Sequence, residues 1–130
     1  MYYIYIAIFG AIGSALRYWI SITLDGNLFP YGTFLINIVG SFLLAVVVTY
    51  LSTLPGISNR LVVGLGTGLI GSFTTFSAFS VQAADFILNR HYVMGGAYVL
   101  ISLLCGFLSA ALGVYASNKW ISRRGLIENE

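Results

Sequence analysis

Charged residues are what this sequence has least of. Asp, Glu, Lys and Arg make up only 8% of its 130 residues, whereas 58% are hydrophobic. A soluble domain carries about 25% charged residues, so this composition indicates a membrane protein. The net charge of +2 is too small and too dispersed to indicate a nucleic-acid partner. A proton-coupled carboxylate relay also lacks a candidate, because none of the four acids falls in the middle of an apolar run: Asp25, Asp85, Glu128 and Glu130.

Cysteine and histidine are each present only once, as Cys105 and His91. A single cysteine cannot form an internal disulfide, and one histidine cannot provide the His/Cys cluster of a transition-metal site. The sequence also lacks a nucleophile with a neighbouring base and a phosphate-binding glycine loop, so we expect no enzyme activity. The N-terminal stretch MYYIYIAIFGAIG has no basic region of the kind that starts a cleaved signal peptide, and we interpret it as the start of a retained span.

Long intervals without charge divide the chain into membrane spans. The intervals over 26–59, 61–84 and 91–118 each exceed the roughly 20 residues that a helix needs to cross a bilayer. The two prolines, Pro30 and Pro55, fall in short connectors, and short connectors make sequential spans antiparallel neighbours. We therefore expect an all-α integral membrane protein with four spans at about 3–24, 31–53, 60–88 and 92–118, followed by a hydrophilic tail over 119–130.

The basic residues give only a weak signal for orientation. Four of them share the side of the termini, which favours cytoplasmic termini, and Arg90 lies on the other side. Three of those four belong to the tail, however, and the connectors alone carry one basic residue on each side. The bias is therefore compatible with insertion in both orientations. Four spans enclose too little interior for a wide aqueous pore, so we expect a transport function to need an oligomer.

Arg17 lies inside the first predicted span, where a charged residue is costly unless it faces protein or water. Gly10, Ser14, Arg17 and Ser21 follow each other at helical spacings and form one polar stripe. Two interpretations of Arg17 are open. Its guanidinium reaches a lipid headgroup at the span end, or it provides a positive charge at a water-filled vestibule, where it attracts anions.

The second and fourth predicted spans also carry stripes of hydrogen-bonding side chains. Thr33, Asn37 and Ser41 are spaced by four and share a helix face. Asn37 is the notable member, because its amide offers two N–H donors that need partners. An interhelical hydrogen bond and a role in ligand binding explain it equally well. The fourth span repeats the pattern with Tyr98, Ser102, Cys105 and Ser109.

The third predicted span contains the string GSFTTFSAFS over residues 71–80, in which five residues are Ser or Thr and three are Phe. Four glycines precede or start it, and each weakens a helix by about 1 kcal/mol relative to alanine. The side chains of Ser72, Thr74 and Thr75 then compete for backbone hydrogen bonds. We therefore expect a helix break near residues 71–75. The glycines are Gly64, Gly66, Gly68 and Gly71.

A broken backbone at membrane depth is tolerated only where protein buries it or where it lines a cavity. Carbonyl oxygens freed by the break are suitable ligands for a small, hard cation. After the break, Phe76 and Phe79 share one helix face, and Ser77 and Ser80 share the adjacent one. A packing seam rich in Ser and Thr is the alternative explanation of this string.

GSFTTFSAFS, together with GTFLINIVGS in the second span, resembles the Fluc (CrcB-type) fluoride channels. The resemblance covers nearly the whole chain in length, span number and the placing of Arg17, Asn37, Tyr98 and Ser102. It implies a passive, fluoride-selective channel in the cytoplasmic membrane of a prokaryote, where fluoride export relieves toxicity. It also implies an antiparallel, dual-topology homodimer with two fluoride pathways along the dimer interface.

The same resemblance implies roles for individual residues. Phe76 and Phe79 match the two phenylalanines that line each pathway, and Arg17 matches a vestibule arginine. The backbone carbonyls of Gly71 and Thr74, from both subunits, match a structural sodium site on the two-fold axis. Many members carry Glu at the position of Gln82, which is the one departure from the pattern. The polar positions matched along the pathway are Thr33, Asn37, Thr75, Ser77, Ser80, Gln82, Tyr98 and Ser102.

Two other classes of protein fit the length and the number of spans less well. A small multidrug-resistance-type exporter exchanges cations against protons through a glutamate in its first span, where this chain has Arg17 and no glutamate. A membrane scaffold subunit without transport activity explains the glycines, but it does not explain three aligned donor stripes.

Overall fold

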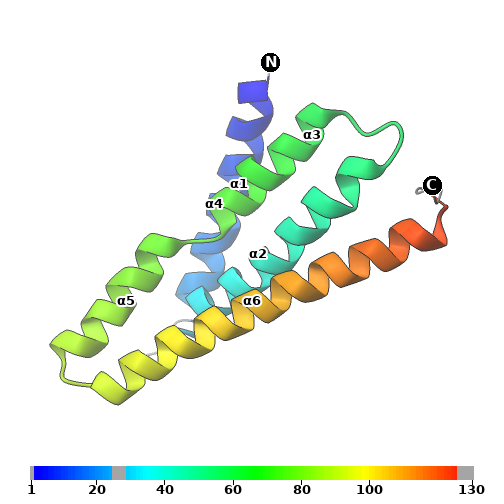
Figure 1. Cartoon of the computed structure of the whole chain (residues 1–130). Coiled ribbons are helices and arrows are strands. Elements are labelled where there is room, and N and C mark those ends of the chain that lie inside the picture. Colours follow the sequence, from blue (N-terminus) through cyan, green and yellow to red (C-terminus); the bar gives the residue numbers. More distant parts are fainter. Residues whose placement is uncertain (1, 25–28, 126–130) are drawn as a thin grey trace.

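The computed structural model describes residues 2–24 and 29–125 (Figure 1). All the secondary-structure elements in these ranges are helices, apart from a single bridge residue at Pro30. Helix α1 spans Tyr2–Leu24, and α2 spans Tyr31–Thr49 with the 3₁₀ turn η1, Leu51–Thr53, at its end. The third span consists of α3 (Asn59–Val63), the π-helical segment η2 (Gly64–Ile70), α4 (Gly71–Phe73) and α5 (Phe76–Leu88). Helix α6 spans Tyr92–Arg123.

Four of the described helical segments are long and apolar enough to cross a membrane: Tyr2–Leu24, Tyr31–Thr53, Asn59–Leu88 and Tyr92–Arg123. The chain is thus a multi-pass, all-helical membrane protein. Pro30 stands at the N-cap of α2, and Pro55 lies in the turn between η1 and α3. Helix α6 continues past residue 118, where the predicted fourth span ends, so the first part of the hydrophilic tail is helical as far as Arg123.

The third span is interrupted at Thr74 and Thr75, within the range predicted to break. Both residues have extended backbone, with ψ of 154° at Thr74 and φ of −145° at Thr75. The helix before the break is already irregular, because η2 has π-helical hydrogen bonding over its glycine-rich sequence GLGTGLI. Figure 1 shows α5 leaving the break beside α4 and running toward the start of α6. The third span therefore has two halves with different neighbours.

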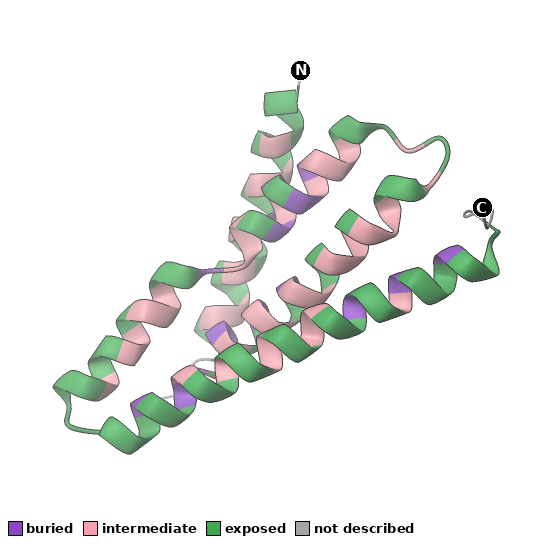
Figure 2. Ribbon diagram, viewed as in Figure 1, coloured by how far each residue is buried: buried purple, intermediate pink, exposed green. Residues whose placement is uncertain are grey.

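The two halves of the third span pack differently. Segment η2 lies against α1, whereas α5 meets α6, and the most extensive helix pair is α2 with α6. Few residues are fully enclosed in the single chain, as Figure 2 shows by its scarce purple segments. The buried hydrophobic side chains are Ile36, Ile70, Tyr98 and Ile121. Most of the apolar surface is exposed, so it must be covered by lipid or by another protein chain.

The contact between α1 and η2 is a close approach of two backbones. A Cβ atom at Gly13 would overlap the carbonyl oxygen of Leu69, and one at Gly68 would lie 3.0 Å from the carbonyl oxygen of Ile6. Small residues allow helices to approach in this way, and packing of this kind drives helix association in membranes. The glycines of η2 thus place the first half of the third span directly against α1.

We predict that Gly13→Ala lowers the free energy of unfolding by about 1–3 kcal/mol, because the new methyl group cannot displace the Leu69 carbonyl without moving a helix. The measurement is the thermal unfolding midpoint of the purified protein in detergent. Gly96→Ala is the matched control, since a Cβ at Gly96 meets nothing within 4 Å. The control should be neutral or stabilising by up to about 1 kcal/mol, and equal midpoints for the two variants would contradict the prediction.

Candidate functional site

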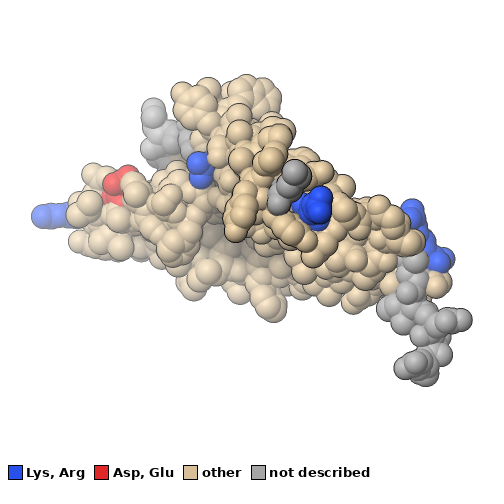
Figure 3. Space-filling model, turned by 90° about the horizontal axis from the view of Figure 1, so that it is seen from above, with Lys and Arg blue, Asp and Glu red and all other residues tan. Residues whose placement is uncertain are grey.

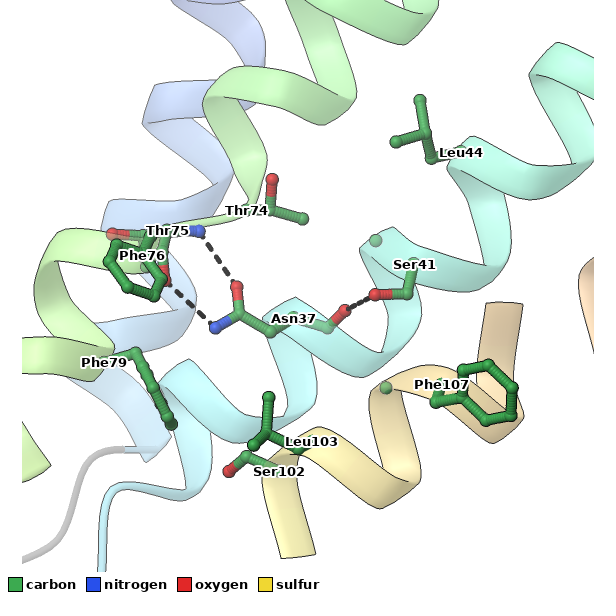
Figure 4. A pocket seen from close by; sticks show the side chains of 12 residues that line it. Asn37, Ser41, Leu44, Thr74, Thr75, Phe76, Phe79, Ser102, Leu103 and Phe107 are labelled. Carbon is green, nitrogen blue, oxygen red and sulfur yellow. Dashed lines mark hydrogen bonds between the residues drawn. The ribbon is translucent and has the colours of Figure 1, made fainter. Parts of the chain in front are cut away.

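The side chain of Asn37 joins α2 to the break in the third span. Its Nδ2 donates to the Thr75 carbonyl at 3.0 Å, and its Oδ1 accepts from the Thr75 N–H at 2.9 Å. Figure 4 shows the amide reaching across from α2 with both hydrogen bonds side by side. This pairing fixes the orientation of the amide, since its oxygen must face the N–H and its nitrogen the carbonyl. We call this pair of hydrogen bonds the Asn37–Thr75 clamp.

The clamp changes which carbonyl groups are satisfied at the break. In an unbroken helix the Thr75 N–H would bond the Gly71 carbonyl, but here it donates to Asn37. The Ala78 N–H would likewise bond the Thr74 carbonyl, but it donates to the Thr75 hydroxyl at 3.2 Å, which caps α5. The carbonyls of Gly71 and Thr74 therefore lose their helical donors to side chains, and the extended backbone at Thr74 and Thr75 also removes the helical donors of the Ser72 and Phe73 carbonyls. Two of these four carbonyls, those of Gly71 and Thr74, are the ones that the sequence resemblance assigns to a cation.

Three aromatic rings line up behind the break. The Phe76 and Phe79 ring centroids are 6.0 Å apart, and Phe79 is 5.2 Å from Tyr98. Phe76 is 80% exposed in the single chain, whereas Tyr98 is fully buried. The rings of Phe29 and Phe86 also pack on Tyr98, with centroids 5.4 Å and 5.9 Å away. The row of rings Phe76, Phe79 and Tyr98 therefore runs from the surface of the chain into its interior.

Gln82 connects three helices through its side-chain amide. The Tyr98 hydroxyl of α6 donates to its Oε1 at 2.9 Å, and its Nε2 donates to the Thr33 hydroxyl of α2 at 3.0 Å. One bond uses the amide oxygen as an acceptor, and the other uses the amide nitrogen as a donor. A carboxylate has no donor, so an ionised Glu at this position could not make the same pair of bonds. The amide of Gln82 thus fits its neighbours as they stand.

An open pocket of about 390 Å³ lies beside the clamp, between α2, α5 and α6. Asn37 and Ser102 provide polar groups in it, and the rings of Phe76 and Phe79 form part of its wall (Figure 4). The Ser102 hydroxyl is buried and has no hydrogen-bond partner among the described residues. The clamp uses one of the two Asn37 amide hydrogens, which leaves the other for a ligand. These two donors suit an anion or another acceptor.

A second open pocket, of about 450 Å³, lies on the other side of the break between α1 and α5. Arg17, Tyr18 and Ser21 line it from α1, and Ser77, Val81 and Gln82 line it from α5. Thr75 lines both pockets, and its hydroxyl lies 3.2 Å from that of Ser77. Arg17 therefore lines a cavity that Thr75, a member of the clamp, also lines.

The structure brings together most of the residues that the sequence singled out. Asn37, Thr75, Phe76, Phe79 and Ser102 line the first pocket. Gln82 is hydrogen-bonded to two further predicted residues, Thr33 and Tyr98. Two predicted residues are exceptions: Gly71 lines neither pocket, and Ser80 lines neither pocket and donates its hydroxyl to the Phe76 carbonyl in its own helix. The complete set at the two pockets or in the Gln82 bridge is Arg17, Thr33, Asn37, Thr74, Thr75, Phe76, Ser77, Phe79, Gln82, Tyr98 and Ser102.

Several residues of the first pocket were not predicted as site residues. Ser41, whose hydroxyl donates to the Asn37 carbonyl at 2.7 Å, lies one turn beyond Asn37. Gly106 and Phe107 lie four and five residues beyond Ser102 on the same side of α6. Ser41 belongs to the polar stripe of the second predicted span, and helical spacing from Ser102 would have found Gly106. The side chains of Gly106 and Phe107 give no polar signal of their own.

Comparison with known proteins identifies the relatives of this chain. A family model described as "CrcB-like protein, Camphor Resistance (CrcB)" matches residues 4–114. The fluoride-specific ion channel FluC 2 of Listeria innocua serovar 6a is 42% identical over 123 residues, which cover 95% of each chain. FluC 2 of Listeria monocytogenes serovar 1/2a is 39% identical over the same shares. FluC 1 of Bacillus cereus is 37% identical over 98% of this chain and 95% of its own.

These matches confirm the resemblance seen in the sequence. They cover nearly the whole chain, and the relatives are named as ion channels and not as enzymes, in agreement with the expectation above. The chain therefore belongs to the CrcB family, which includes the FluC fluoride-specific ion channels.

Proposed function

We propose that this protein is a passive, fluoride-selective ion channel that exports fluoride across the cytoplasmic membrane and so relieves fluoride toxicity. The observation that carries the proposal is the identity of 42% over 95% of both chains with a protein named a fluoride-specific ion channel. The pocket beside the Asn37–Thr75 clamp supports it, because that pocket offers hydrogen-bond donors and aromatic rings but no carboxylate.

The chemistry of the pocket suits a small and strongly hydrated anion. A pore must replace the water of such an ion with donors of comparable strength, which the second Asn37 N–H and the Ser102 hydroxyl can supply. Aromatic rings are positive at their edges, so Phe76 and Phe79 can contact the anion and exclude bulk water. Arg17 lies in the other pocket, where it attracts anions without holding one at the narrow part of the path.

The proposed channel is an antiparallel, dual-topology homodimer with two pathways along its interface. Each chain exposes most of its apolar surface, including 80% of the Phe76 side chain, next to the first pocket. A second copy packed there would close the open side of that pocket. The weak charge bias between the two ends of the chain allows each copy to insert in either orientation.

A structural sodium ion on the two-fold axis of this dimer fits the chemistry of the break. The carbonyls of Gly71 and Thr74 have lost their helical donors to Asn37 and Thr75, and carbonyl oxygens are suitable ligands for a hard cation. When bound, the ion would supply positive charge between the two pathways and link the subunits. A single chain offers two such carbonyls, so a complete set of ligands would need both copies.

Fluoride efflux from liposomes that contain only this chain tests the proposed function. We expect electrogenic efflux, measured with a fluoride electrode, and none with chloride in place of fluoride. Phe76→Ile and Phe79→Ile should each lower fluoride flux about tenfold or more, equivalent to about 1.4 kcal/mol of barrier, because a branched alkyl group has no positive edge.

Phe34→Ile is the control for these two variants, since Phe34 packs on Phe29 and lines neither pocket. All three variants should elute as the unmodified protein does in gel filtration. Normal flux in both pocket variants would remove the phenylalanines from the mechanism, and the absence of fluoride efflux from the unmodified chain would overturn the proposed function.

From the Asn37–Thr75 clamp we predict that two substitutions of Asn37 have different effects, one on stability and one on fluoride flux. Asn37→Leu leaves the Thr75 N–H and carbonyl without partners, so the free energy of unfolding should fall by about 2 kcal/mol or more. Asn37→Asp keeps an acceptor for the N–H but loses the donor and adds a negative charge, so fluoride flux should fall about tenfold or more. Thermal unfolding in detergent and the efflux assay measure the two effects.

Ser52→Ala is the control for both measurements, because the Ser52 hydroxyl bonds only the Val48 carbonyl one turn earlier. Its unfolding free energy should change by less than about 0.5 kcal/mol. If Asn37→Leu were as stable as this control, the clamp would not hold the break in place.

Sodium should stabilise the assembled channel. The gain for a bound ion is RT ln(1 + [Na⁺]/Kd), or about 2.7 kcal/mol at a hundred times Kd. We therefore expect the thermal midpoint to rise with sodium concentration, and to rise less with potassium, which is larger. Equal stability and equal fluoride flux in fully sodium-free buffer would count against the carbonyl site while leaving the channel function intact.

A further inference from the structure

Four basic residues lie at the end of the chain where α2 ends, α3 begins and α6 ends, on two different helices. They are Arg60 of α3 and Lys119, Arg123 and Arg124 at the end of α6. The only acid among the described residues, Asp85, belongs to α5, and on the face seen in Figure 3 red lies near one end. The tail adds Glu128 and Glu130, which lie outside the described residues. Even with both counted, four cations against two acids leave +2 at this end.

Aromatic rings hold two of these cations in place. The guanidinium carbon of Arg60 lies 5.9 Å from the centre of the Tyr2 ring, and that of Arg124 lies 5.7 Å from the Tyr50 ring. Tyr50 in turn meets the ring of Trp120 edge-on at 5.5 Å. A guanidinium on an aromatic face keeps its N–H groups at the rim available for an oxygen ligand. We call the four cations and these three aromatic residues the basic collar.

The position of the collar along the helices matches the headgroup layer of a bilayer. Helix α6 has 32 residues, or about 48 Å, whereas the hydrocarbon core is about 30 Å thick. Its last turns must therefore leave the core even when the helix is tilted. Tyr50 caps α2 where that span ends, and Tyr and Trp are enriched at this depth in membrane proteins. The collar thus lies where lipid phosphates are.

We propose that the basic collar binds the headgroups of acidic phospholipids such as phosphatidylglycerol. The charge is complementary, and the arginine N–H groups can bind phosphate oxygens in pairs. At the opposite end, the described residues offer Arg90 as the basic side chain beside His91, and Asp85 of α5 is also exposed. The inference does not depend on fluoride transport. In the proposed antiparallel dimer, each leaflet would receive one collar.

Quenching of Trp120 fluorescence by brominated lipids tests this proposal. Trp19→Phe leaves Trp120 as the only tryptophan of the full-length protein, which is then reconstituted into two sets of vesicles. One set contains brominated phosphatidylglycerol in ordinary phosphatidylcholine, and the other contains brominated phosphatidylcholine in ordinary phosphatidylglycerol, at the same mole fraction. We expect acidic lipid to be enriched around Trp120 by roughly fivefold for each cation engaged, and the enrichment to shrink in high salt.

Substitution of the four cations should remove the enrichment, in the combined variant Arg60→Gln, Lys119→Gln, Arg123→Gln and Arg124→Gln. Arg90→Gln, at the other end of the chain, is the matched control and should leave the enrichment unchanged. The salt dependence is measured on the chain with all its cations, so it decides the question even if the combined variant does not fold. Equal quenching by both brominated lipids, or an enrichment insensitive to salt, would overturn the proposal.

Discussion

The rest of this structure depends on the two hydrogen bonds between Asn37 and the backbone of Thr75. A helix broken at membrane depth exposes N–H and carbonyl groups that no water can satisfy, so a break needs partners from elsewhere in the protein. Asn37 supplies both for Thr75, and the Thr75 hydroxyl then supplies one for Ala78. The break can therefore persist without a large energetic cost. It in turn sets where α5 starts, and hence where the Phe76 and Phe79 rings lie.

The polar groups of the site divide into those that hold the fold and those that remain for a ligand. Gln82 bonds both Thr33 and Tyr98 and so links three helices, and Ser109 donates to the Ile38 carbonyl at 2.7 Å. Ser102, by contrast, is buried with its hydroxyl unpartnered in the described part of the chain. A buried, unsatisfied hydroxyl costs about 1–3 kcal/mol. That cost is understandable if the group receives a partner when an ion enters the pocket.

The sequence predicted those features that arise from local chemistry. Charge-free intervals located the last three spans, and glycines followed by Ser and Thr located the break at Thr74 and Thr75. It could not choose between the two interpretations of Asn37, because the partner Thr75 lies 38 residues away and periodicity within one helix does not identify it. The bridge from Gln82 to Thr33 spans 49 residues and was missed for the same reason. Segment η2 has π-helical geometry and packs closely on α1, and composition alone shows neither.

Gln82 shows how an amide, in place of a carboxylate, sets the direction of a hydrogen-bond chain. With an amide at this position, the Tyr98 proton goes to Oε1 and Nε2 donates to the Thr33 hydroxyl, so the Thr33 proton is directed to a different acceptor. An ionised carboxylate would accept from both hydroxyls and turn the Thr33 proton toward position 82. The two side chains have nearly the same shape, yet they orient the donors along α2 in opposite senses. In a channel whose ligand is an anion, donor orientation determines which hydroxyls can contact the ion, so the choice between amide and carboxylate at this position bears on the proposed path.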